Sequence, residues 1–539
     1  MHVPQLGRRR PLLIGVGLVA AASLLLSACS STSGAGANKD KAGSGWAKGP
    51  VQFVHAGLAP AHIDPAQAAD LDSFTVTRNI YDPLVWADTD GTIIPWLATE
   101  WEPAADGLST SFTLRKDVKF SGGSTVTSAD VKMSIDRMIA MRAGQAGALL
   151  ASIDSVDASD PNVAVIHTKT PDPFLLTHLT RVGIVSADAV EANKTASDPW
   201  AAAWYDENSD STGPYTLGVW QKATQITLEK NEDWWGGWED GSIDEVVVKF
   251  IPDGATRVQM VERGDADTTE TWTIPDATRV GAMDGFELKT FDTYDIDPLF
   301  SLNTQKPPFD NKLVRQAAQL AFDYEAMKEY WQGQATVPGG PMPNNYPGAI
   351  EFAAYEQNLD EAKSLIEQSG VDLDKNPVTI TVIAGPQEFA VGATIFQDSL
   401  QKVGFKVNVQ TLPGAQALST LGKPDQANNA ITLITSPFTA DPTLFLGNFY
   451  LPEAGFNFSF YDNPQVTDLL NQARSATDES KATMLTQQAE QIIQDDAPAI
   501  WPTVPKTLVP VPDYVDGYEL AIDDFRWTMY FWPLRIREH

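Results

Sequence analysis

Cysteine is almost absent from this chain, which has one, Cys29, among 539 residues. A single cysteine cannot form an intramolecular disulfide bond, so the burial of apolar side chains must stabilise the fold. Hydrophobic residues make up 43% of the sequence, and a chain of this length can bury more than one hydrophobic core. We therefore expect at least two lobes that are held together by packing alone.

The residues and motifs of common catalytic and metal sites are scarce as well. Six histidines are present, and none stands at a metal-ligand spacing such as His-Glu-x-x-His. Neither the Gly-x-Ser-x-Gly turn of many hydrolases nor the Gly-Lys-Ser/Thr phosphate loop occurs after residue 28. We expect no metal, no cofactor and no catalytic residue. A hydrolase that uses two of the 70 acidic residues stays open, because sequence cannot show which carboxylates lie close together.

Basic residues are too few for a nucleic-acid partner. The chain has 38 lysines and arginines against 70 acidic residues, and its formal net charge is −32 at pH 7. A surface that binds nucleic acid needs clustered positive charge, so this class of partner is excluded. The acidic residues are scattered, which is typical of a solvated surface.

As to oligomeric state, we expect the protein to be a monomer.

The first 28 residues have the pattern of an export signal. Arg8–Arg10 is followed by the apolar stretch Pro11–Leu26 and by the small residues Ser27 and Ala28. An uncleaved membrane anchor would need about 20 apolar residues, and this stretch is slightly shorter. We therefore expect the chain to leave the cytoplasm.

The residues that end this segment, Leu26-Ser27-Ala28-Cys29, resemble the lipobox of bacterial lipoproteins. In such proteins the cysteine thiol receives a diacylglycerol and the signal is cleaved before it. The resemblance implies that residues 1–28 are a lipoprotein signal peptide and that Cys29 anchors an extracytoplasmic protein to the cell membrane. Residues 29–48 are mostly Ser, Gly, Ala, Asn and Lys, and we expect them to form a flexible tether.

Helices and strands alternate in the second half of the chain. Apolar periodicity predicts a strand at 378–383, a helix at 388–403 closed by Gly404, and a strand at 405–409. This β-α-β order predicts parallel strands with a right-handed crossover. Other expected elements are a strand at 51–54, alternating strand residues from Thr110 to Phe120, and helices at 127–138, 360–368 and 480–495.

A series of short motifs, in order along the chain, resembles the family 5 solute-binding proteins of ATP-binding cassette (ABC) importers, the oligopeptide, dipeptide and nickel group. Any one motif is weak, but their order and spacing together are specific. They are Ile63-Asp64-Pro65, Asn79-Ile80-Tyr81-Asp82-Pro83-Leu84-Val85, Gly91 to Trp101, Phe112 to Phe120, Thr127 to Lys132, Thr212-Gly213-Pro214-Tyr215, Asn231 to Trp235, Pro307-Pro308-Phe309-Asp310 and Val314-Arg315-Gln316-Ala317.

The resemblance implies an α/β fold of the periplasmic-binding-protein class II type, with two lobes and a ligand cleft between them. Lobe I is expected at residues 49–297, with an extra subdomain inserted at roughly 88–210, lobe II at 298–504, and a return to lobe I at 505–539. The crossings between lobes are expected at Pro298–Leu302 and near Trp501–Pro505. The implied partners are the permease and ATPase subunits of an ABC importer, and no catalysis is implied.

Peptide is the leading ligand class that the resemblance implies, because relatives hold extended peptide by backbone pairing inside the cleft. The corresponding segments are Ala59-Pro60-Ala61-His62 and Ile434-Thr435-Ser436-Pro437-Phe438. Many peptide-binding relatives place an aspartate for the peptide ammonium where this chain has Phe438. Asp441 is instead expected to cap a helix that begins at Pro442.

An oligosaccharide is the alternative ligand class, since some members of the family bind sugars and aromatic rings can stack on sugar faces. Three tryptophans outside the strongest motifs, Trp272, Trp331 and Trp501, are the candidates for such platforms. Nickel is the least expected ligand, because the sequence shows no histidine cluster, although nickel can arrive chelated.

Overall fold

The computed structural model describes residues 45–88, 91–143, 149–270, 272–452, 454–521 and 528–539, and these residues form one compact unit. The predicted signal peptide at 1–28 and the predicted lipidation site, Cys29, lie outside the described residues. In the part of the chain that is described, no helix is long and apolar enough to cross a membrane.

The end of the predicted tether belongs to the folded body. Trp46 forms an isolated β-bridge with Arg537, and the guanidinium of Arg535 lies 3.7 Å from the centroid of the Trp46 ring. The prediction of a flexible tether up to residue 48 is therefore wrong at its end. The Trp46 ring and the backbone hydrogen bonds of Gly45 and Ala47 dock this segment on the C-terminal segment of the chain.

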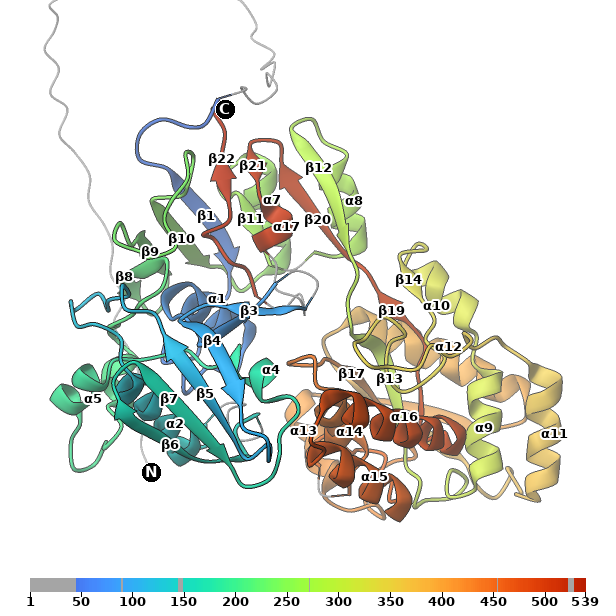
Figure 1. Cartoon of the computed structure of the whole chain (residues 1–539). Helices are drawn as coiled ribbons and strands as arrows, with labels where there is room; N and C mark the ends of the chain where they lie inside the picture. Colours follow the sequence, from blue (N-terminus) through green and yellow to red (C-terminus); the bar gives the residue numbers. More distant parts are fainter. Residues whose placement is uncertain (1–44, 89–90, 144–148, 271, 453, 522–527) are drawn as a thin grey trace, which may run out of the picture. The chain divides into compact units, whose positions relative to one another are not determined.

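Lobe I, which we define as the described residues of 45–291 and 507–539, contains a five-stranded sheet in the order β11-β1-β10-β9-β8 (Figure 1). Strand β1 is parallel to both of its neighbours. The C-terminal segment enters the same core, where the Phe531 ring lies 6.0 Å from that of Phe53. The strands are β1 (Gln52–Gly57), β8 (Tyr215–Gln221), β9 (Gln225–Lys230), β10 (Glu245–Phe250) and β11 (Thr268–Thr269).

A second sheet of lobe I is antiparallel, has the order β4-β5-β7-β6 and falls within the predicted inserted subdomain. Helix α2 (Ser128–Met141) packs on β6 and β7, and it begins where the sequence predicted, with Thr127 as the N-cap and Asp130 accepting from the Thr127 N–H at 2.8 Å. The strands are β4 (Ala98–Pro103), β5 (Ser109–Leu114), β6 (Ile153–Asp160) and β7 (Val163–Thr168).

Lobe II, residues 296–505, is built around a mixed sheet in the order β16-β15-β17-β13-β18. Strands β15 and β16 are parallel and are joined by helix α12 (Gln387–Lys402), so the predicted β-α-β unit is confirmed. The second strand begins at Val407 rather than at residue 405, because the Phe405 N–H still bonds to the helix carbonyl of Leu400. The strands are β13 (Ile296–Leu302), β15 (Val378–Ile383), β16 (Val407–Leu412), β17 (Ala430–Thr435) and β18 (Ala499–Ile500).

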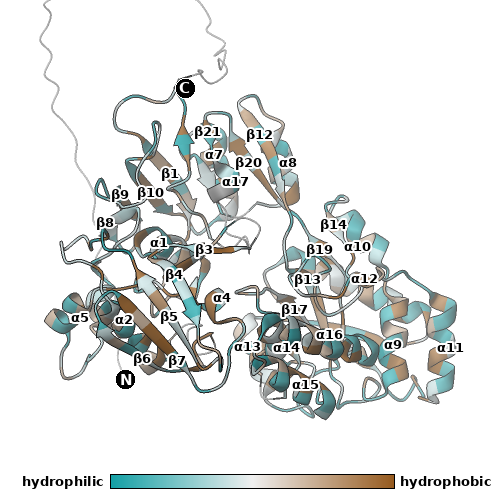
Figure 2. Cartoon of the chain, viewed as in Figure 1, coloured by the Kyte–Doolittle hydropathy of each residue, from teal (hydrophilic) through white to brown (hydrophobic). Residues whose placement is uncertain are grey.

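Amphipathic helices cover this sheet, and α9, α11 and α16 each carry both hydrophobic and hydrophilic residues along their length (Figure 2). The helices expected at 360–368 and 480–495 correspond to α11 and α16. The principal helices of lobe II are α9 (Lys312–Ala321), α10 (Tyr324–Tyr330), α11 (Leu359–Ser369), α14 (Pro442–Tyr450), α15 (Pro464–Arg474) and α16 (Glu479–Asp496).

Two chain segments connect the lobes, and they lie side by side. Strand β12 (Phe286–Phe291) pairs antiparallel with β20 (Thr507–Pro512), and further along the Asp297 N–H donates to the Thr503 carbonyl at 2.9 Å. Since β13 is already part of the lobe II sheet, the first crossing precedes Pro298 instead of spanning Pro298–Leu302. The second crossing lies between Thr503 and Thr507, close to the predicted position.

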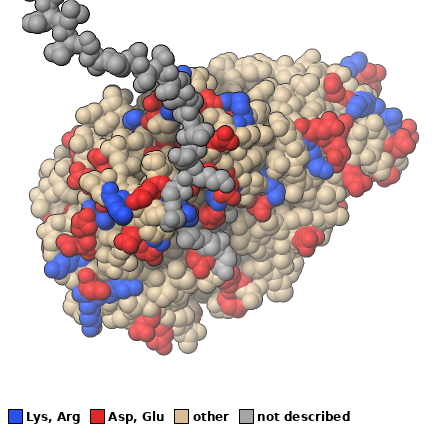
Figure 3. Space-filling model, turned by 90° about the horizontal axis from the view of Figure 1, so that it is seen from above, with Lys and Arg blue, Asp and Glu red and all other residues tan. Residues whose placement is uncertain are grey.

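The remaining elements are short or surround these sheets. Acidic side chains are spread over the face shown in Figure 3, with lysines and arginines between them. The strands are β2 (Val85–Ala87), β3 (Ile93–Pro95), β14 (Ala335–Thr336), β19 (Val504–Pro505), β21 (Val515–Asp516) and β22 (Arg535–Ile536), and the helices are α1 (Leu71–Ile80), α4 (Leu175–Leu179), α5 (Ala187–Asn193), α6 (Ala202–Tyr205), α7 (Gly254–Arg263), α8 (Ile274–Gly281), α13 (Gly414–Ser419), η1 (Thr420–Gly422) and α17 (Tyr518–Ala521).

Candidate functional site

The first predicted ligand segment, Ala59–His62, follows the end of β1 in lobe I. Ala59 and Ala61 are exposed, Pro60 is buried, and His62 is half-buried with its Nδ1 at 2.9 Å from Asp206. The backbone N–H of His62 donates to Ser73, and Pro60 has no N–H. The donors that this segment can offer to an extended ligand are therefore those of Ala59 and Ala61.

The second predicted segment, Ile434–Phe438, leaves the end of β17 in lobe II. Ile434 is 42% exposed, whereas Thr435 is buried and pairs with Ile296 of β13. The Ser436 hydroxyl donates to Asp295 Oδ1 at 2.6 Å. Phe438 is half-buried and lines a small cavity together with the rings of Tyr346, Phe445 and Phe449. An aromatic side chain, and not a carboxylate, is therefore present at this position of the candidate peptide segment.

The three candidate tryptophans lie in different surroundings. Trp501 is 0% exposed and donates its Nε1–H to the Tyr450 hydroxyl at 2.9 Å, so it is a packing residue of the lobe II core and not a stacking platform. Trp331 is half-buried and donates to Thr503 Oγ1 at 3.0 Å. Trp272 is half-buried and packs with Trp331 against the same small apolar cluster, Ile274, Ala277 and Leu508. The fold therefore brings together Trp272 and Trp331, whereas Trp501 belongs to a different cluster, the lobe II core.

Two carboxylates at the start of β13 were not anticipated. Asp297 is 7% exposed, and its Oδ1 has no hydrogen-bond partner in the described structure. Burial raises the pKa of Asp297 well above its usual value, and the nearby charges of Glu388 and Asp295 raise it further. Burial also raises the pKa of Asp295 to about 7, although the hydrogen bond from Ser436 opposes this shift. The sequence does contain a signal for this pair, because the two acids flank Ile296 in an otherwise apolar segment.

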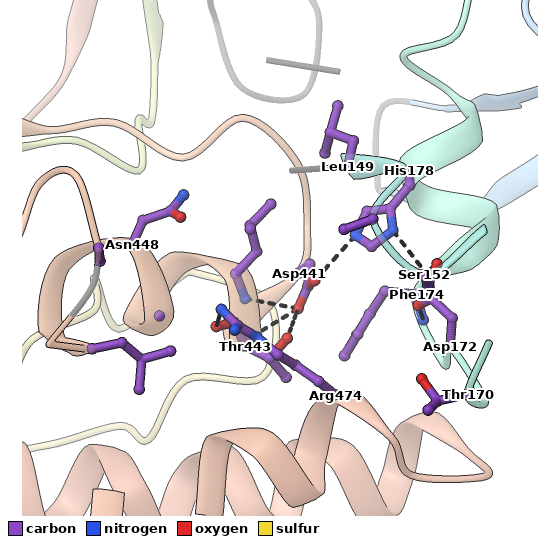
Figure 4. Close-up of a pocket in the computed structure, with 15 residues that line it drawn as sticks. Leu149, Ser152, Thr170, Asp172, Phe174, His178, Asp441, Thr443, Asn448 and Arg474 are labelled. Carbon is purple, nitrogen blue, oxygen red and sulfur yellow. Dashed lines mark hydrogen bonds and ion pairs between the residues drawn. The ribbon is translucent and has the colours of Figure 1, made fainter. Parts of the chain in front are cut away.

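A charged contact between the lobes was also missed. His178 of α4 in lobe I places its Nε2 at 3.1 Å from Asp441 of lobe II and its Nδ1 at 3.4 Å from Asp172 (Figure 4). The Ser152 hydroxyl donates to the same Asp172 at 2.6 Å. Burial lowers the pKa of His178, but hydrogen bonds and charges from Asp172 and Asp441 outweigh burial and raise the pKa to about 10. His178 is therefore a buried cation between two carboxylates at neutral pH.

Asp441 has two roles in this contact. Its Oδ1 accepts from the N–H groups of Thr443 and Leu444 at 2.8 and 3.1 Å, so the predicted cap of the helix that begins at Pro442 is confirmed. Its Oδ2 faces His178. A cavity of about 480 Å³ adjoins the pair and is lined also by Asn448 of α14 and Arg474 of α15 (Figure 4). The cap therefore fixes a carboxylate at the point where lobe II meets the inserted subdomain.

The arrangement suits binding between two lobes. In the described residues, no group of three or more His, Cys, Asp and Glu side chains is placed to hold a metal ion.

A model of the bacterial extracellular solute-binding proteins, family 5 Middle, matches residues 92–457, more than half of the chain. The chain belongs to this family. As a family 5 solute-binding protein it binds a solute and does not convert it, which removes the hydrolase alternative.

Several known proteins resemble this family 5 protein over most of its length. The probable D,D-dipeptide-binding periplasmic protein DdpA of Escherichia coli is 28% identical over 455 residues, 82% of this chain and 86% of DdpA. The glutathione-binding protein GsiB of Pectobacterium atrosepticum is 28% identical over 457 residues, 81% of this chain and 85% of GsiB. The structure of the ABC transporter-associated periplasmic binding protein DppA of Helicobacter pylori, in complex with the peptide STSA, is 27% identical. It has a TM-score of 0.73 and covers 90% of this chain and 98% of that one. The predicted two-lobed α/β fold and the predicted family are thereby confirmed.

Proposed function

We propose that this protein captures peptides between its lobes outside the cytoplasm and delivers them to the permease of an ABC importer. The observation that carries the proposal is the similarity along most of the chain to DdpA and to the peptide complex of DppA. Segment Ile434–Phe438 supports it, because this segment continues a sheet strand and Ile434 is exposed. An extended peptide can add to such a segment through its backbone.

Capture would depend on lobe closure. The two connections between the lobes run side by side, so the lobes can rotate about them while each sheet stays intact. A peptide that contacts both lobes binds the closed form more tightly and shifts the population toward it. The His178–Asp441 contact joins α4 to α14 and would be made or broken by that rotation.

Thermal unfolding with ligand panels tests the proposal. At 100 times its dissociation constant a peptide should add about 2.7 kcal/mol to the unfolding free energy, which a shift in the melting temperature reports. Dipeptides to tetrapeptides form one panel and oligosaccharides of matched size form the other. Stabilisation by sugars alone would transfer the assignment to the oligosaccharide alternative, whose candidate platforms are now Trp272 and Trp331.

We also propose that the protein is held at the membrane by acyl chains on Cys29, as the lipobox-like sequence Leu26-Ser27-Ala28-Cys29 implies. The folded body begins at about Trp46, so the tether between anchor and body would be about 17 residues long. A short tether keeps the binding lobes at high effective concentration near a membrane permease.

A further inference from the structure

We infer that Asp295, Asp297 and Glu388, together with the rings of Tyr330 and Trp331, form a subsite for an organic cation, an ammonium or guanidinium group of the ligand. The inference rests on the proposed function, since the cation would belong to a solute captured between the lobes. It concerns a feature that neither the sequence motifs nor the helix cap at Asp441 explain.

The backbone fixes Asp297 at the point where the two connections between the lobes meet. Its N–H donates to the Thr503 carbonyl at 2.9 Å, and its own carbonyl accepts from the Thr503 hydroxyl at 2.6 Å. The same hydroxyl accepts from the Trp331 indole N–H at 3.0 Å. This chain of bonds holds the Trp331 ring beside β13, and it uses the backbone of Asp297 while leaving the carboxylate Oδ1 without a partner.

The other carboxylates come from separate elements. Asp295 precedes β13 and accepts from Ser436, which lies within the candidate peptide segment. Glu388 stands in the first turn of α12 and is half-buried. Both act electrostatically on Asp297, and both Glu388 and Asp297 act on Tyr330 of α10. Three acidic groups from two segments, the start of β13 and the first turn of α12, therefore converge.

No basic side chain balances these acids. Among the described residues, no lysine, arginine or histidine lies within 4 Å of Asp295, Asp297 or Glu388, and Lys506 on the neighbouring connection pairs with Asp292 at 3.2 Å instead. A buried carboxylate without a counter-charge is costly, so the site favours either a bound proton or a cation brought by the ligand. The same side chains are not placed as metal ligands.

Two aromatic rings complete the proposed cation subsite. Tyr330 and Trp331 meet edge to face with ring centroids 5.0 Å apart. Carboxylates with aromatic rings beside them suit an organic cation, because the charge pairs with the acids while its apolar part rests on the rings. A peptide ammonium would find its counter-charge at Asp295 and Asp297. The cation can come from the free amino terminus of a peptide or from a lysine or arginine side chain.

Calorimetric titration with matched tetrapeptides tests this subsite and separates the two sources. One pair compares a free amino terminus with its acetylated form, and a second pair, both acetylated, compares lysine with norleucine at one position. We expect removal of the charge in one of the pairs to weaken binding to the wild type at least tenfold. Asp297→Asn, which preserves volume, should reduce that difference to less than threefold, and so should Glu388→Gln on a different element.

The matched control is Glu329→Gln, which makes the same charge change on an exposed residue next to Tyr330 and should leave the tenfold difference intact. Equal binding of charged and neutral peptides by the wild type overturns the subsite and leaves the proposed function standing. Binding of no peptide overturns the proposed function instead. In that case cadaverine, a diamine, tests the subsite. A higher melting temperature of the wild type with cadaverine, and no such rise for Asp297→Asn, supports the subsite. Any other result overturns it.

Discussion

Two buried ionisable residues, His178 and Asp297, lie at the junction of the lobes, and they differ in the charges around them. His178 is a cation between Asp172 and Asp441, whereas Asp297 has no counter-charge within reach among the described residues. The first arrangement stabilises a contact that the chain makes with itself. The second leaves a charge requirement that a solute can satisfy.

Replacement of His178 by Gln should lower the unfolding free energy at pH 7 by about 3 kcal/mol, because two buried carboxylates lose their shared cation. The pKa of His178 rises from 6.5 to about 10 on folding. Its contribution is therefore fully present below pH 6.5 and is lost as the pH rises through 10. Urea unfolding of the wild type between pH 6 and 10 should show this loss, and His178→Gln should not. His167→Gln, in the nearby strand β7, is the control, and equal pH slopes for wild type and His178→Gln would contradict the assignment.

Affinity for a cationic peptide should increase between pH 6 and 8. The pKa of Asp295 is raised to about 7 by burial, and a cation favours the ionised carboxylate, so binding near neutral pH releases a proton. Ser436 after β17 donates to Asp295, the neighbouring Asp297 interacts electrostatically with Asp295, and Glu388 on α12 acts on Asp297. Calorimetry in buffers of different ionisation enthalpy measures the proton release. Asp295→Asn should reduce that release, and an unchanged release would contradict this role of Asp295.

At the scale of elements, helix α12 packs closely on the strand that carries the acidic residues. A Cβ atom built on Gly392 would lie 2.6 Å from Pro298 Cγ and 3.2 Å from the Phe300 ring. The helix therefore needs a residue without a side chain where it crosses β13. This close approach fixes the position of the α12 N-terminus, and with it Glu388, relative to β13.

Gly392→Ala should destabilise the protein by about 2 kcal/mol, because the added methyl overpacks α12 against β13. The intrinsic helix propensity of alanine alone would change stability in the opposite direction by about 1 kcal/mol. The control is Gly422→Ala, since no atom lies within 4 Å of the Cβ position there. Denaturant unfolding measures both variants. A stabilised Gly392→Ala protein would show that α12 can move away from the strand.

Local sequence signals predicted elements better than they predicted the site. The cap at Asp441 and the glycines at 370 and 404 placed helix ends to within one or two residues, because these signals act between neighbours in the chain. The pairing of Ser436 with Asp295 spans 141 residues and that of His178 with Asp441 spans 263. Such contacts depend on how the sheets and lobes assemble, which no local pattern in one sequence encodes. The burial of Trp501 in the lobe II core also depends on this assembly, and the residues next to Trp501 in the sequence do not reveal it.

At the scale of the whole molecule, the order of motifs along the chain was informative where single motifs were not. The family match spans both lobes, and the similarity to DdpA and GsiB extends over more than 80% of the chain. The same fold can serve different solutes, because specificity depends on the side chains of the site and not on the fold. Phe438 and the acids around Asp297 are the side chains that we expect to select the ligand.

The proposed anchor makes a prediction for the intact protein. Cys29→Ala should abolish acylation and release the protein from the membrane fraction, because Cys29 is the single cysteine of the chain and the proposed anchor needs its thiol. Metabolic labelling with a fatty-acid probe and cell fractionation measure the two effects. Unchanged labelling and unchanged fractionation of the variant would contradict the lipobox interpretation.

Isothermal titration of the purified protein with dipeptides to tetrapeptides, followed by mass spectrometry of the recovered ligand, tests whether the protein captures peptides without converting them. We expect saturable binding of one peptide per protein and recovery of that peptide uncleaved. Failure of every peptide to bind, or recovery of cleaved peptide, would contradict this expectation.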